Sequence, residues 1–389
     1  MLNESKIILL PSLKEFTFKE IQGGIEKKAL IDLPDYFHKV LNFCYEWLND
    51  KNHFSVNTSG STGKARKISL SRKIMEMSAL KTNDYFNLQA GMNIFLPLSV
   101  DHIAGKMMLV RAMMGHLHCY VAEAQADIAG LFENISSKNH LVFDFSVMVP
   151  LQLDKLLQTT HPSLINITFP CILLGGSSIS PQLETKIQKL KSNIHLSYGM
   201  TETASHVALR KLNGEDKQTS FHPLKGITIQ TDSEQRLLIK GDITNGQTLQ
   251  TNDVGECFKD QYFVVLGRSD TIINSGGIKI NPETIESYIF GIISNMFKKT
   301  NDDHIHFNYL ISAQNDAVLG QKCIFVTDNP NFNHEHWEFL IRELRKQVEF
   351  SATMLPKNWH FINKLPTTTI GKFKRIEIIT ILNNIKNNN

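Results

Sequence analysis

Residues 171–199 read CILLGGSSISPQLETKIQKLKSNIHLSYG, in which two short apolar runs flank a stretch with helical spacing. The same alternation extends upstream through the apolar runs MNIFLPL, LHCYVA and LVFDFSVMVP, which begin at residues 92, 117 and 141. Each run is followed by a turn signal or a helical pattern. This alternation is typical of a parallel β-sheet covered by helices. The sequence therefore predicts an α/β fold.

The sequence on either side of this region has a different character. The first 55 residues read mainly as helix, with helical spacing in DLPDYFHKVLNFCYEWLND. Hairpin-like strands follow from about residue 221, and a smaller α+β unit from about residue 282. We therefore expect a large domain over 1–266, with mixed and parallel sheets layered with helices plus a β-rich subdomain. A small, mobile α+β domain is expected over 267–389, and the division falls inside GRSDTIINSGG.

The composition of the 389-residue chain is that of a soluble globular protein, with 42% hydrophobic and 20% charged residues. A net charge of +3 is too small to indicate nucleic acid binding. Five single cysteines without a CxxC pair argue against a zinc site or a disulfide framework and fit a reducing compartment. No apolar stretch approaches the ~20 residues of a membrane span. We expect a cytoplasmic protein that binds no nucleic acid and does not insert into membranes.

Residues 57–69, NTSGSTGKARKIS, combine hydroxyls, glycines and cations in the manner of a phosphate-binding loop. They do not form the loop of P-loop NTPases, because only two residues separate Gly60 from Gly63 and Ala65 stands where a hydroxyl is needed. The glycines still let the backbone approach a ligand closely, and the hydroxyls and cations can bind phosphate. Read alone, the stretch is equally consistent with an ordinary polar loop between a strand and a helix.

Further stretches carry groups that suit a nucleotide. LSYGMTETAS (196–205) lies at the end of an expected strand, where ligands bind in parallel sheets. In it, Tyr198 can stack on a base, Thr201 can bond a phosphate and Glu202 can hold Mg²⁺ through oxygen. In TNDVGE, the two oxygens of Asp253 suit a pair of ribose hydroxyls.

Two later stretches complete the pattern. GRSDTIINSGG supplies Arg268 and a glycine pair, and LPTTTIGKFKR supplies Lys372. Each residue has a structural alternative when taken alone: Tyr198 as a core aromatic, Asp253 as a turn residue and Lys372 as solvated surface. Five such stretches in this order make coincidence an inadequate explanation.

The order and residues of these stretches resemble the AMP-forming acyl-adenylating superfamily, which includes acyl-CoA synthetases and peptide-synthetase adenylation domains. The resemblance runs from about residue 55 to 375 and is most specific at TSGSTGKARK, YGMTE, GRSDTIINSGG and GKFKR. It implies that the first loop binds the triphosphate tail of ATP. The residues it assigns to ATP or AMP binding are Thr58, Ser59, Gly60, Ser61, Thr62, Gly63, Arg66, Gly175, Gly176, Ser177, Tyr198, Gly199, Met200, Asp253 and Arg268.

The chain departs from the superfamily's pattern at two points. Ala65, Arg66 and Lys67 replace the usual Pro-Lys-Gly, and Asn252 replaces the glycine before Asp253. Arg66 keeps the positive charge, so ATP binding is expected to persist.

The resemblance also implies a two-step reaction, in which a carboxylate attacks the α-phosphate of ATP to give acyl-AMP and pyrophosphate, and a thiol then displaces AMP. Lys372, Thr201 and Glu202 would be catalytic, with Glu202 as the Mg²⁺ ligand and Lys372 bridging carboxylate and α-phosphate. One such donor is worth roughly 3–4 kcal/mol. For the second step the small domain would turn about Asp270, withdrawing Lys372 and bringing Gly276–Gly277 to the thiol channel.

Two local features resemble the o-succinylbenzoate–CoA ligases of menaquinone synthesis. His102 begins a His-x-x-Gly pattern with Arg111 nine residues later, and VPLQLDKLL is followed by CILLGGSSIS. A dicarboxylate needs a second cation besides the reaction centre, and Arg111 and His102 are the candidates. Arg111 is equally consistent with an exposed position on a helix. Some 57 residues precede the phosphate loop, so a shortened N-terminal subdomain is expected.

Three functions stay open at this point. The first is an o-succinylbenzoate–CoA ligase that uses ATP, Mg²⁺ and CoA. The second is an adenylating enzyme that loads another acid onto CoA or a carrier protein, and the absence of a carrier domain favours free CoA. The third is a non-catalytic nucleotide-binding relative, against which the intact Glu202, Asp253, Arg268 and Lys372 count. The expected partners are a small carboxylic acid, ATP and CoA, and the sequence is compatible with a homo-oligomer.

Overall fold

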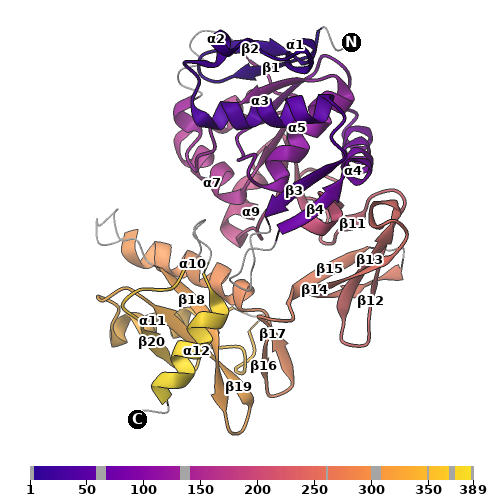
Figure 1. Cartoon of the computed structure of the whole chain (residues 1–389). Coiled ribbons are helices and arrows are strands. Elements are labelled where there is room, and N and C mark those ends of the chain that lie inside the picture. The colour runs from indigo at the N-terminus through magenta and orange to yellow at the C-terminus, as the bar shows by residue number, and fades with distance from the viewer. Residues whose placement is uncertain are drawn as a thin grey trace.

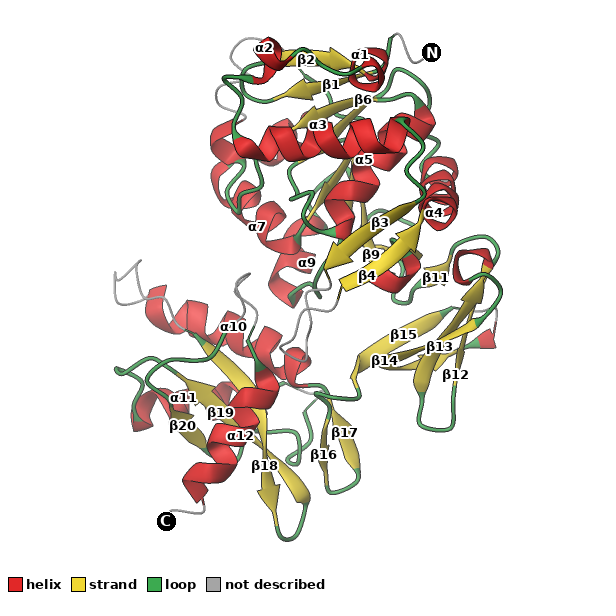
Figure 2. Ribbon diagram, viewed as in Figure 1, coloured by secondary structure: helices red, strands yellow, loops and turns green. Residues whose placement is uncertain are grey.

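The computed structural model describes residues 4–57, 67–131, 141–259, 262–298, 308–347, 350–367 and 373–386. The first part of the chain forms an upper body, a smaller sheet lies beside it, and the last part forms a lower unit (Figure 1). Figure 2 shows that the upper and lower parts both combine helices with strands. The predicted α/β fold class is confirmed.

A nine-stranded sheet organises the upper body, in the order β11-β10-β9-β8-β7-β5-β6-β1-β2. The six strands from β9 to β1 in this order run parallel to one another, and antiparallel strands lie at both edges. The strands are β1 (Lys6–Leu9), β2 (Lys14–Thr17), β5 (Asn93–Leu96), β6 (His118–Val121), β7 (Phe145–Met148), β8 (Cys171–Leu174), β9 (Asn193–Gly199), β10 (His206–Lys211) and β11 (His222–Pro223). The expectation of mainly helix before residue 55 is wrong for β1 and β2.

Helices cover both faces of this sheet, because alternate residues of a strand point to opposite sides. In β5, Ile94 and Leu96 pack in one core with α3, α4 and α5, whereas Phe95 packs in another with α7, α8 and α9. Burial on both faces explains why the parallel strands read as continuous apolar runs. The helices are α1 (Phe18–Gly23), α2 (Lys27–Leu30), α3 (Asp35–Leu48), α4 (Arg72–Tyr85), α5 (Ile103–Gly115), α7 (Pro150–Thr159), α8 (Pro162–Thr168) and α9 (Pro181–Ile187).

A two-stranded ribbon brackets the stretch 58–66. Its strands β3 (His53–Asn57) and β4 (Lys67–Ser71) are antiparallel, with Asn57 opposite Lys67. Helix α4 begins directly after β4, where the Ser71 side chain accepts a hydrogen bond from the Ile74 N–H and caps the helix. Residues 58–66, which include the expected triphosphate-binding residues, lie outside the described part of the chain.

The smaller sheet and the lower unit follow in sequence. The smaller sheet is antiparallel and contains β12 (Ile227–Thr231), β13 (Arg236–Gly241), β14 (Thr248–Cys257) and β15 (Phe263–Arg268). The lower unit has a sheet in the order β17-β16-β19-β18 with β20 beside β19, and its own apolar cores. Its elements are β16 (Ile273–Ser275), β17 (Ile278–Ile280), α10 (Pro282–Lys298), β18 (Tyr309–Asp316), β19 (Gly320–Thr327), α11 (His334–Arg345), β20 (Trp359–Phe361) and α12 (Arg375–Lys386). The expected division between residues 266 and 267 falls inside β15.

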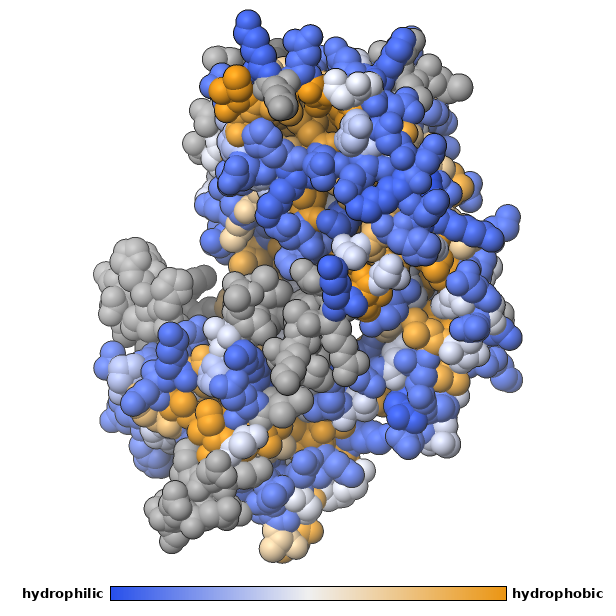
Figure 3. Space-filling view, viewed as in Figure 1, coloured by the Kyte–Doolittle hydropathy of each residue, from blue (hydrophilic) through white to orange (hydrophobic). Residues whose placement is uncertain are grey.

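The visible surface is mostly hydrophilic, and its apolar side chains lie in small separate areas (Figure 3). Within the described ranges, no helix has both the length and the apolar character that a membrane crossing requires.

Candidate active site

The carboxyl ends of the neighbouring parallel strands β8 and β9 bring two predicted nucleotide-binding segments together. Residues 175–177 follow β8, and Tyr198 and Gly199 end β9. A Cβ atom built at Gly175 would lie 2.6 Å from Ser197 Oγ, so the turn after β8 passes directly against β9. This edge of a parallel sheet is where ligands bind in α/β folds.

Gly199 has a structural requirement of its own. A Cβ atom there would lie 2.4 Å from the Ser205 carbonyl oxygen and 2.5 Å from His206 Cα. Only glycine lets the backbones of β9 and β10 approach this closely. The role of Gly199 in nucleotide binding therefore stays a prediction beside this packing role.

The segment after β9 is a short 3₁₀ turn, η1 (Thr201–Thr203). The Met200 N–H donates to Thr203 Oγ1 at 3.2 Å, which fixes the start of the turn. Glu202 is exposed on it, and η1 lies next to β4. The fold thus places Thr201 and Glu202 beside the strand that leaves the 58–66 stretch, although more than a hundred residues separate them in sequence.

Four side chains form a polar network between the large sheet and the smaller one. Tyr198 donates its hydroxyl to Asp253 Oδ2 at 2.8 Å, and Arg268 Nη1 lies 3.4 Å from Asp253 Oδ1. Arg268 also binds Asp270 with two hydrogen bonds, of 3.0 and 2.9 Å. Burial raises the pKa of Asp253, and burial together with the Asp253 charge raises the pKa of Tyr198. The network connects Asp253, the residue expected to bind the ribose hydroxyls, to Asp270, the expected hinge residue.

The ring of Tyr198 lies in an aromatic cluster. Its centroid is 5.2 Å from that of Phe263 and 5.8 Å from that of Phe221. The side chain is 9% exposed. Tyr198 is therefore a core aromatic whose hydroxyl reaches the site, and stacking of this ring on adenine stays a prediction.

Arg111 is buried, at 2% exposure, so the alternative of an exposed helix position is wrong. Its Nη2 donates to Ser205 Oγ at 2.5 Å, directly after η1. Burial lowers the pKa of Arg111 to about 9. Burial and the charge of Arg111 hold the pKa of His206 well below its usual value, so this neighbour is neutral at neutral pH. No carboxylate in the described ranges forms an ion pair with Arg111.

Sequence reasoning missed the polar side chains around Arg111. Ser205 Oγ lies 3.1 Å from His206 Nδ1, and His206 Nε2 lies 3.3 Å from Thr82 Oγ1 on α4. Ser205 stands within the quoted stretch LSYGMTETAS, which is the one sequence signal that pointed to it. The result is a buried cation surrounded by neutral hydrogen-bonding groups.

His102 and Arg111 do not converge. His102 immediately precedes α5, and Arg111 lies near the other end of that helix. Nine residues correspond to two and a half turns and about 13 Å of rise, so the two side chains leave opposite sides of the helix. A single carboxylate could not bind both side chains directly.

The expected metal ligand Glu202 is exposed on η1. No group of three or more His, Cys, Asp or Glu side chains suited to a metal occurs among residues with described positions. The role of Glu202 as a Mg²⁺ ligand stays a prediction.

The lower unit carries the remaining predicted residues. Gly276 and Gly277, at φ 58° and 81°, form a two-residue turn between β16 and β17, as left-handed hairpin turns require. Lys372 lies outside the described residues. The residues flanking its stretch are fixed, because Thr367 pairs with Phe373 and the Lys374 N–H donates to the Pro366 carbonyl at 2.9 Å.

Comparison with known proteins adds an independent finding. The family model described as AMP-binding enzyme matches residues 49–267. A 2-succinylbenzoate–CoA ligase of Lactococcus lactis is 26% identical over 340 residues, which cover 83% of this chain and 70% of the relative. An AMP-forming acyl-CoA synthetase/AMP-acid ligase II-like protein of Dyadobacter fermentans is 34% identical, with 90% of this chain and 95% of that one covered and a TM-score of 0.55.

The chain therefore belongs to the AMP-binding enzyme family, as an AMP-forming acid–CoA ligase. A further solved structure, o-succinylbenzoate CoA synthetase of Bacillus subtilis with its acyl-adenylate intermediate, is 20% identical. The likeness covers 83% of this chain and 68% of that one, with a TM-score of 0.66. At this identity the likeness shows the fold.

Proposed function

We propose that the protein is an o-succinylbenzoate–CoA ligase of menaquinone biosynthesis. It would convert the acid and ATP to acyl-AMP and pyrophosphate, and then form the CoA thioester with release of AMP. The observation that carries the proposal is Arg111, a buried cation with no carboxylate partner in the described ranges, located next to η1. A dicarboxylate supplies the missing negative charge, whereas a fatty acid does not.

Arg111 suits the carboxylate of the substrate that does not react. A buried charge without a partner is unfavourable, and a bound carboxylate relieves that cost through charge-assisted hydrogen bonds. The guanidinium is already held by Ser205, so little side-chain entropy is lost on binding. The names of the relatives, which are 2-succinylbenzoate–CoA ligases, agree with this substrate.

The nucleotide would bind across the edge formed by β8, β9 and the smaller sheet. Asp253 would accept hydrogen bonds from the ribose hydroxyls, next to Arg268, and the backbone of residues 175–177 would border the base. Thr201 and the 58–66 stretch would hold the phosphates. Glu202 would hold Mg²⁺, whose charge offsets the negative charge that develops on the phosphate oxygens. The Bacillus subtilis relative has been solved with ATP and magnesium ion.

Catalysis in the first step would depend on fixed positive charge. Lys372 would stabilise the charge that develops as the carboxylate attacks, and removal of such a donor costs roughly 3–4 kcal/mol. The lower unit would then turn about Asp270 and present Gly276–Gly277 to the thiol.

A panel of acids with ATP and CoA, scored by AMP release, tests the proposal. We expect a far higher kcat/KM for o-succinylbenzoate than for benzoate or a medium-chain fatty acid. A preference for fatty acids would reject this substrate. Release of AMP only when a phosphopantetheinylated carrier protein replaces CoA would favour the carrier-loading alternative.

A further inference from the structure

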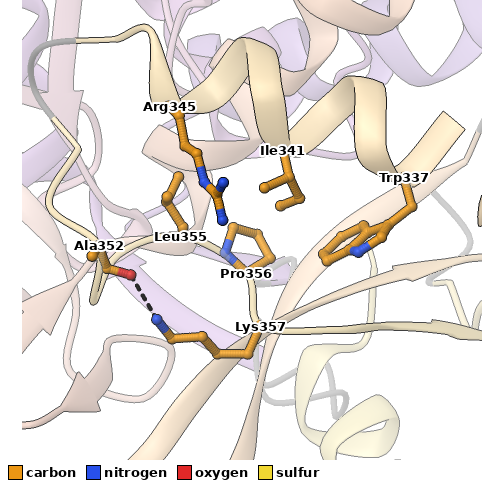
Figure 4. Close-up of a pocket in the computed structure, with 7 residues that line it drawn as sticks. All are labelled: Trp337, Ile341, Arg345, Ala352, Leu355, Pro356 and Lys357. Carbon is orange, nitrogen blue, oxygen red and sulfur yellow. Dashed lines mark hydrogen bonds between the residues drawn. The ribbon is translucent and has the colours of Figure 1, made fainter. Parts of the chain in front are cut away.

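The buried guanidinium of Arg111 is oriented by very few contacts. Within the described ranges it forms one side-chain hydrogen bond, from Nη2 to Ser205 Oγ, and its Nε is buried there without a partner. Arg345 on α11 also forms no ion pair among the described residues, but it lies exposed beside a groove of the lower unit (Figure 4). Water can bind an exposed guanidinium, whereas a buried one depends on its protein partners. The groups behind Ser205 therefore decide where Arg111 points.

Ser205 begins a series of hydrogen bonds that reaches the backbone of α4. Ser205 Oγ lies 3.1 Å from His206 Nδ1, and His206 Nε2 lies 3.3 Å from Thr82 Oγ1. Thr82 Oγ1 in turn donates to the Ser78 carbonyl at 3.1 Å. We call Arg111, these three side chains and the Ser78 carbonyl the Arg111 network. It joins α5 to the start of β10 and ends on α4.

The two ends of the Arg111 network fix the direction of every hydrogen bond in it. Arg111 can only donate, so Ser205 Oγ accepts and directs its single proton to His206 Nδ1, which must then be unprotonated. At the other end, Thr82 gives its only proton to the Ser78 carbonyl, so Oγ1 accepts the hydrogen bond from His206 Nε2. Both ends therefore require the same state of His206, a neutral imidazole with its proton on Nε2.

The other two states of the imidazole leave a polar group unsatisfied. With the proton on Nδ1, Ser205 Oγ would face two donors, and its own proton would have no acceptor among the described residues. An imidazolium would do the same and would add a second buried charge beside Arg111. Burial and the charges of Arg111 and His195 hold the pKa of His206 well below its usual value. Neutral His206 with its proton on Nε2 is thus the state that satisfies the Arg111 network.

The backbone fixes His206 for this role. His206 begins β10, where the register against β9 shifts between His206 and Ala208, and such a bulge turns a side chain relative to its sheet. The backbone of Gly199 lies so close that a Cβ atom built there would be 2.5 Å from His206 Cα. His206 is only 6% exposed. The imidazole is therefore held by packing as well as by hydrogen bonds.

We propose that His206 is a positioning residue, which as the neutral Nε2–H tautomer fixes Ser205 and so aims the Arg111 guanidinium at the carboxylate that does not react. The proposal rests on the proposed o-succinylbenzoate–CoA ligase function and extends it to the side chains behind Arg111. A hydroxyl that donates to one partner is a better acceptor for another, so the bond from Arg111 to Ser205 is strongest when His206 accepts. The Thr82 hydroxyl, three hydrogen bonds from Arg111, holds His206 in this tautomer.

The first kinetic test changes the far end of the Arg111 network. Thr82→Val keeps the shape of the side chain but leaves His206 Nε2–H without its acceptor. We expect KM for o-succinylbenzoate to rise about fivefold, the net value of one hydrogen bond, while kcat and KM for ATP change by less than twofold. Thr82→Ser restores the hydroxyl and should keep KM within twofold of the unchanged protein. Thr168→Val, the same change at a buried threonine of α8, is the matched control.

Two changes at His206 separate hydrogen bonding from packing. In His206→Asn the side-chain Oδ1 can take the place of Nδ1 and accept from Ser205, whereas His206→Leu offers no acceptor. We expect KM for o-succinylbenzoate to rise about tenfold or more in His206→Leu and clearly less in His206→Asn. An equal rise in the two variants would mean that packing alone is responsible, and would overturn the proposal.

Nitrogen-15 NMR of the full-length, histidine-labelled protein tests the tautomer without any acid, with His206→Asn to assign the signal. We expect an unprotonated Nδ1 and a protonated Nε2 at neutral pH. A protonated Nδ1 overturns the proposal. An unchanged KM in Thr82→Val also overturns it, as does an equal rise for o-succinylbenzoate and for a monocarboxylate that the protein accepts. If the acid panel rejects o-succinylbenzoate while Nδ1 is unprotonated, the substrate is wrong and the direction of the Arg111 network stands, so the two proposals fail separately.

Discussion

At the scale of single residues, Arg111 combines a cost in stability with a proposed role in substrate binding. We expect Arg111→Met to raise the free energy of unfolding by about 1–2 kcal/mol, because an uncharged side chain of similar length avoids burial of the guanidinium. The same variant should raise KM for o-succinylbenzoate about tenfold or more through loss of a charged hydrogen bond. Urea unfolding and steady-state kinetics measure the two effects. An equal rise in KM for a monocarboxylate that the protein accepts would contradict the role.

A second residue-scale prediction concerns His195, which is 7% exposed and lies against the rings of Tyr85 and Phe86. Burial lowers the pKa of His195 to about 4. The unfolded chain, with a pKa near 6.5, therefore takes up this proton first as the pH falls. Stability should be lost between pH 6.5 and 4, by about 3 kcal/mol at 1.36 kcal/mol per pH unit. His195→Phe should flatten the dependence of the unfolding free energy on pH over this range, and an unchanged dependence would refute the idea.

We expect Lys372 to act in the first chemical step and not in the second. Lys372→Ala should lose about two to three orders of magnitude in adenylation, as expected for one pre-organised donor. Thioester formation from supplied acyl-AMP and CoA should continue at nearly the normal rate. Lys374→Ala is the control, because Lys374 is paired with Glu377 at 3.2 Å, and its effect should be mild. Ordinary pyrophosphate exchange in the Lys372 variant would reject the assignment.

Sequence reasoning singled out individual residues of the candidate site but did not predict which other side chains surround them. Tyr198 and Asp253 were both singled out, but their hydrogen bond joins residues 55 positions apart and depends on how β14 meets β9. The burial of Arg111 could not be predicted, because α5 is apolar on nearly every face and gives no sign of which side is outermost.

At the scale of elements, one ion pair joins α10 to the start of α12. Arg375 binds both carboxylate oxygens of Glu286, with Nη1 2.8 Å from Oε1 and Nη2 2.5 Å from Oε2. Arg375 also donates to the Ile311 carbonyl at 2.9 Å, and the Ile311 N–H donates to Glu286 at 2.6 Å. Both side chains are mostly buried. The pair fixes α12 three residues after Lys372.

We expect Arg375→Met to destabilise the lower unit by about 3–5 kcal/mol, because it leaves the Glu286 carboxylate buried without a partner. The double variant Arg375→Met/Glu286→Gln should recover part of this loss. Thermal unfolding measures the loss of stability, and hydrogen exchange of the backbone amides in β18 shows that the loss is in the lower unit. Lys374→Ala again serves as the control, with a change below about 1 kcal/mol for its more exposed pair. A double variant less stable than Arg375→Met would contradict the argument.

The elements themselves were predictable where a run was apolar throughout. The strands from β5 to β9 coincide with the quoted apolar runs. Because these strands are buried on both faces, their sequences are apolar almost throughout and are easily told from polar loops. β2 was missed because its sequence, KEFT, buries only Phe16 and does not read as an apolar run. β1 is a short apolar run next to a stretch with helical spacing, and it reads equally well as part of a buried helix.

At the scale of the whole molecule, the lower unit is expected to turn about Asp270. Asp270→Pro should restrict the turn by fixing φ and should impair one half-reaction more than the other. The variant also removes the two hydrogen bonds to Arg268. Asp270→Ala removes the same bonds while leaving φ free, so the difference between the two variants isolates the hinge. Equal loss of both half-reactions in Asp270→Pro would count against Asp270 as the pivot.

The order of the strands in the large sheet bears on how the chain reaches its fold during synthesis. β7, β8, β9, β10 and β11 lie side by side in the order in which they leave the ribosome. Each strand after β7 therefore pairs with the one made just before it, and the sheet widens at one edge. The opposite edge of the sheet depends on pairing between strands that are far apart in the sequence, because Ile7 in β1 pairs with Cys119 in β6. Mostly sequential pairing keeps the contact order low and shortens the time for which an unpaired strand edge can aggregate. The N-terminal hairpin is the part of the sheet that must wait for its neighbour to be made.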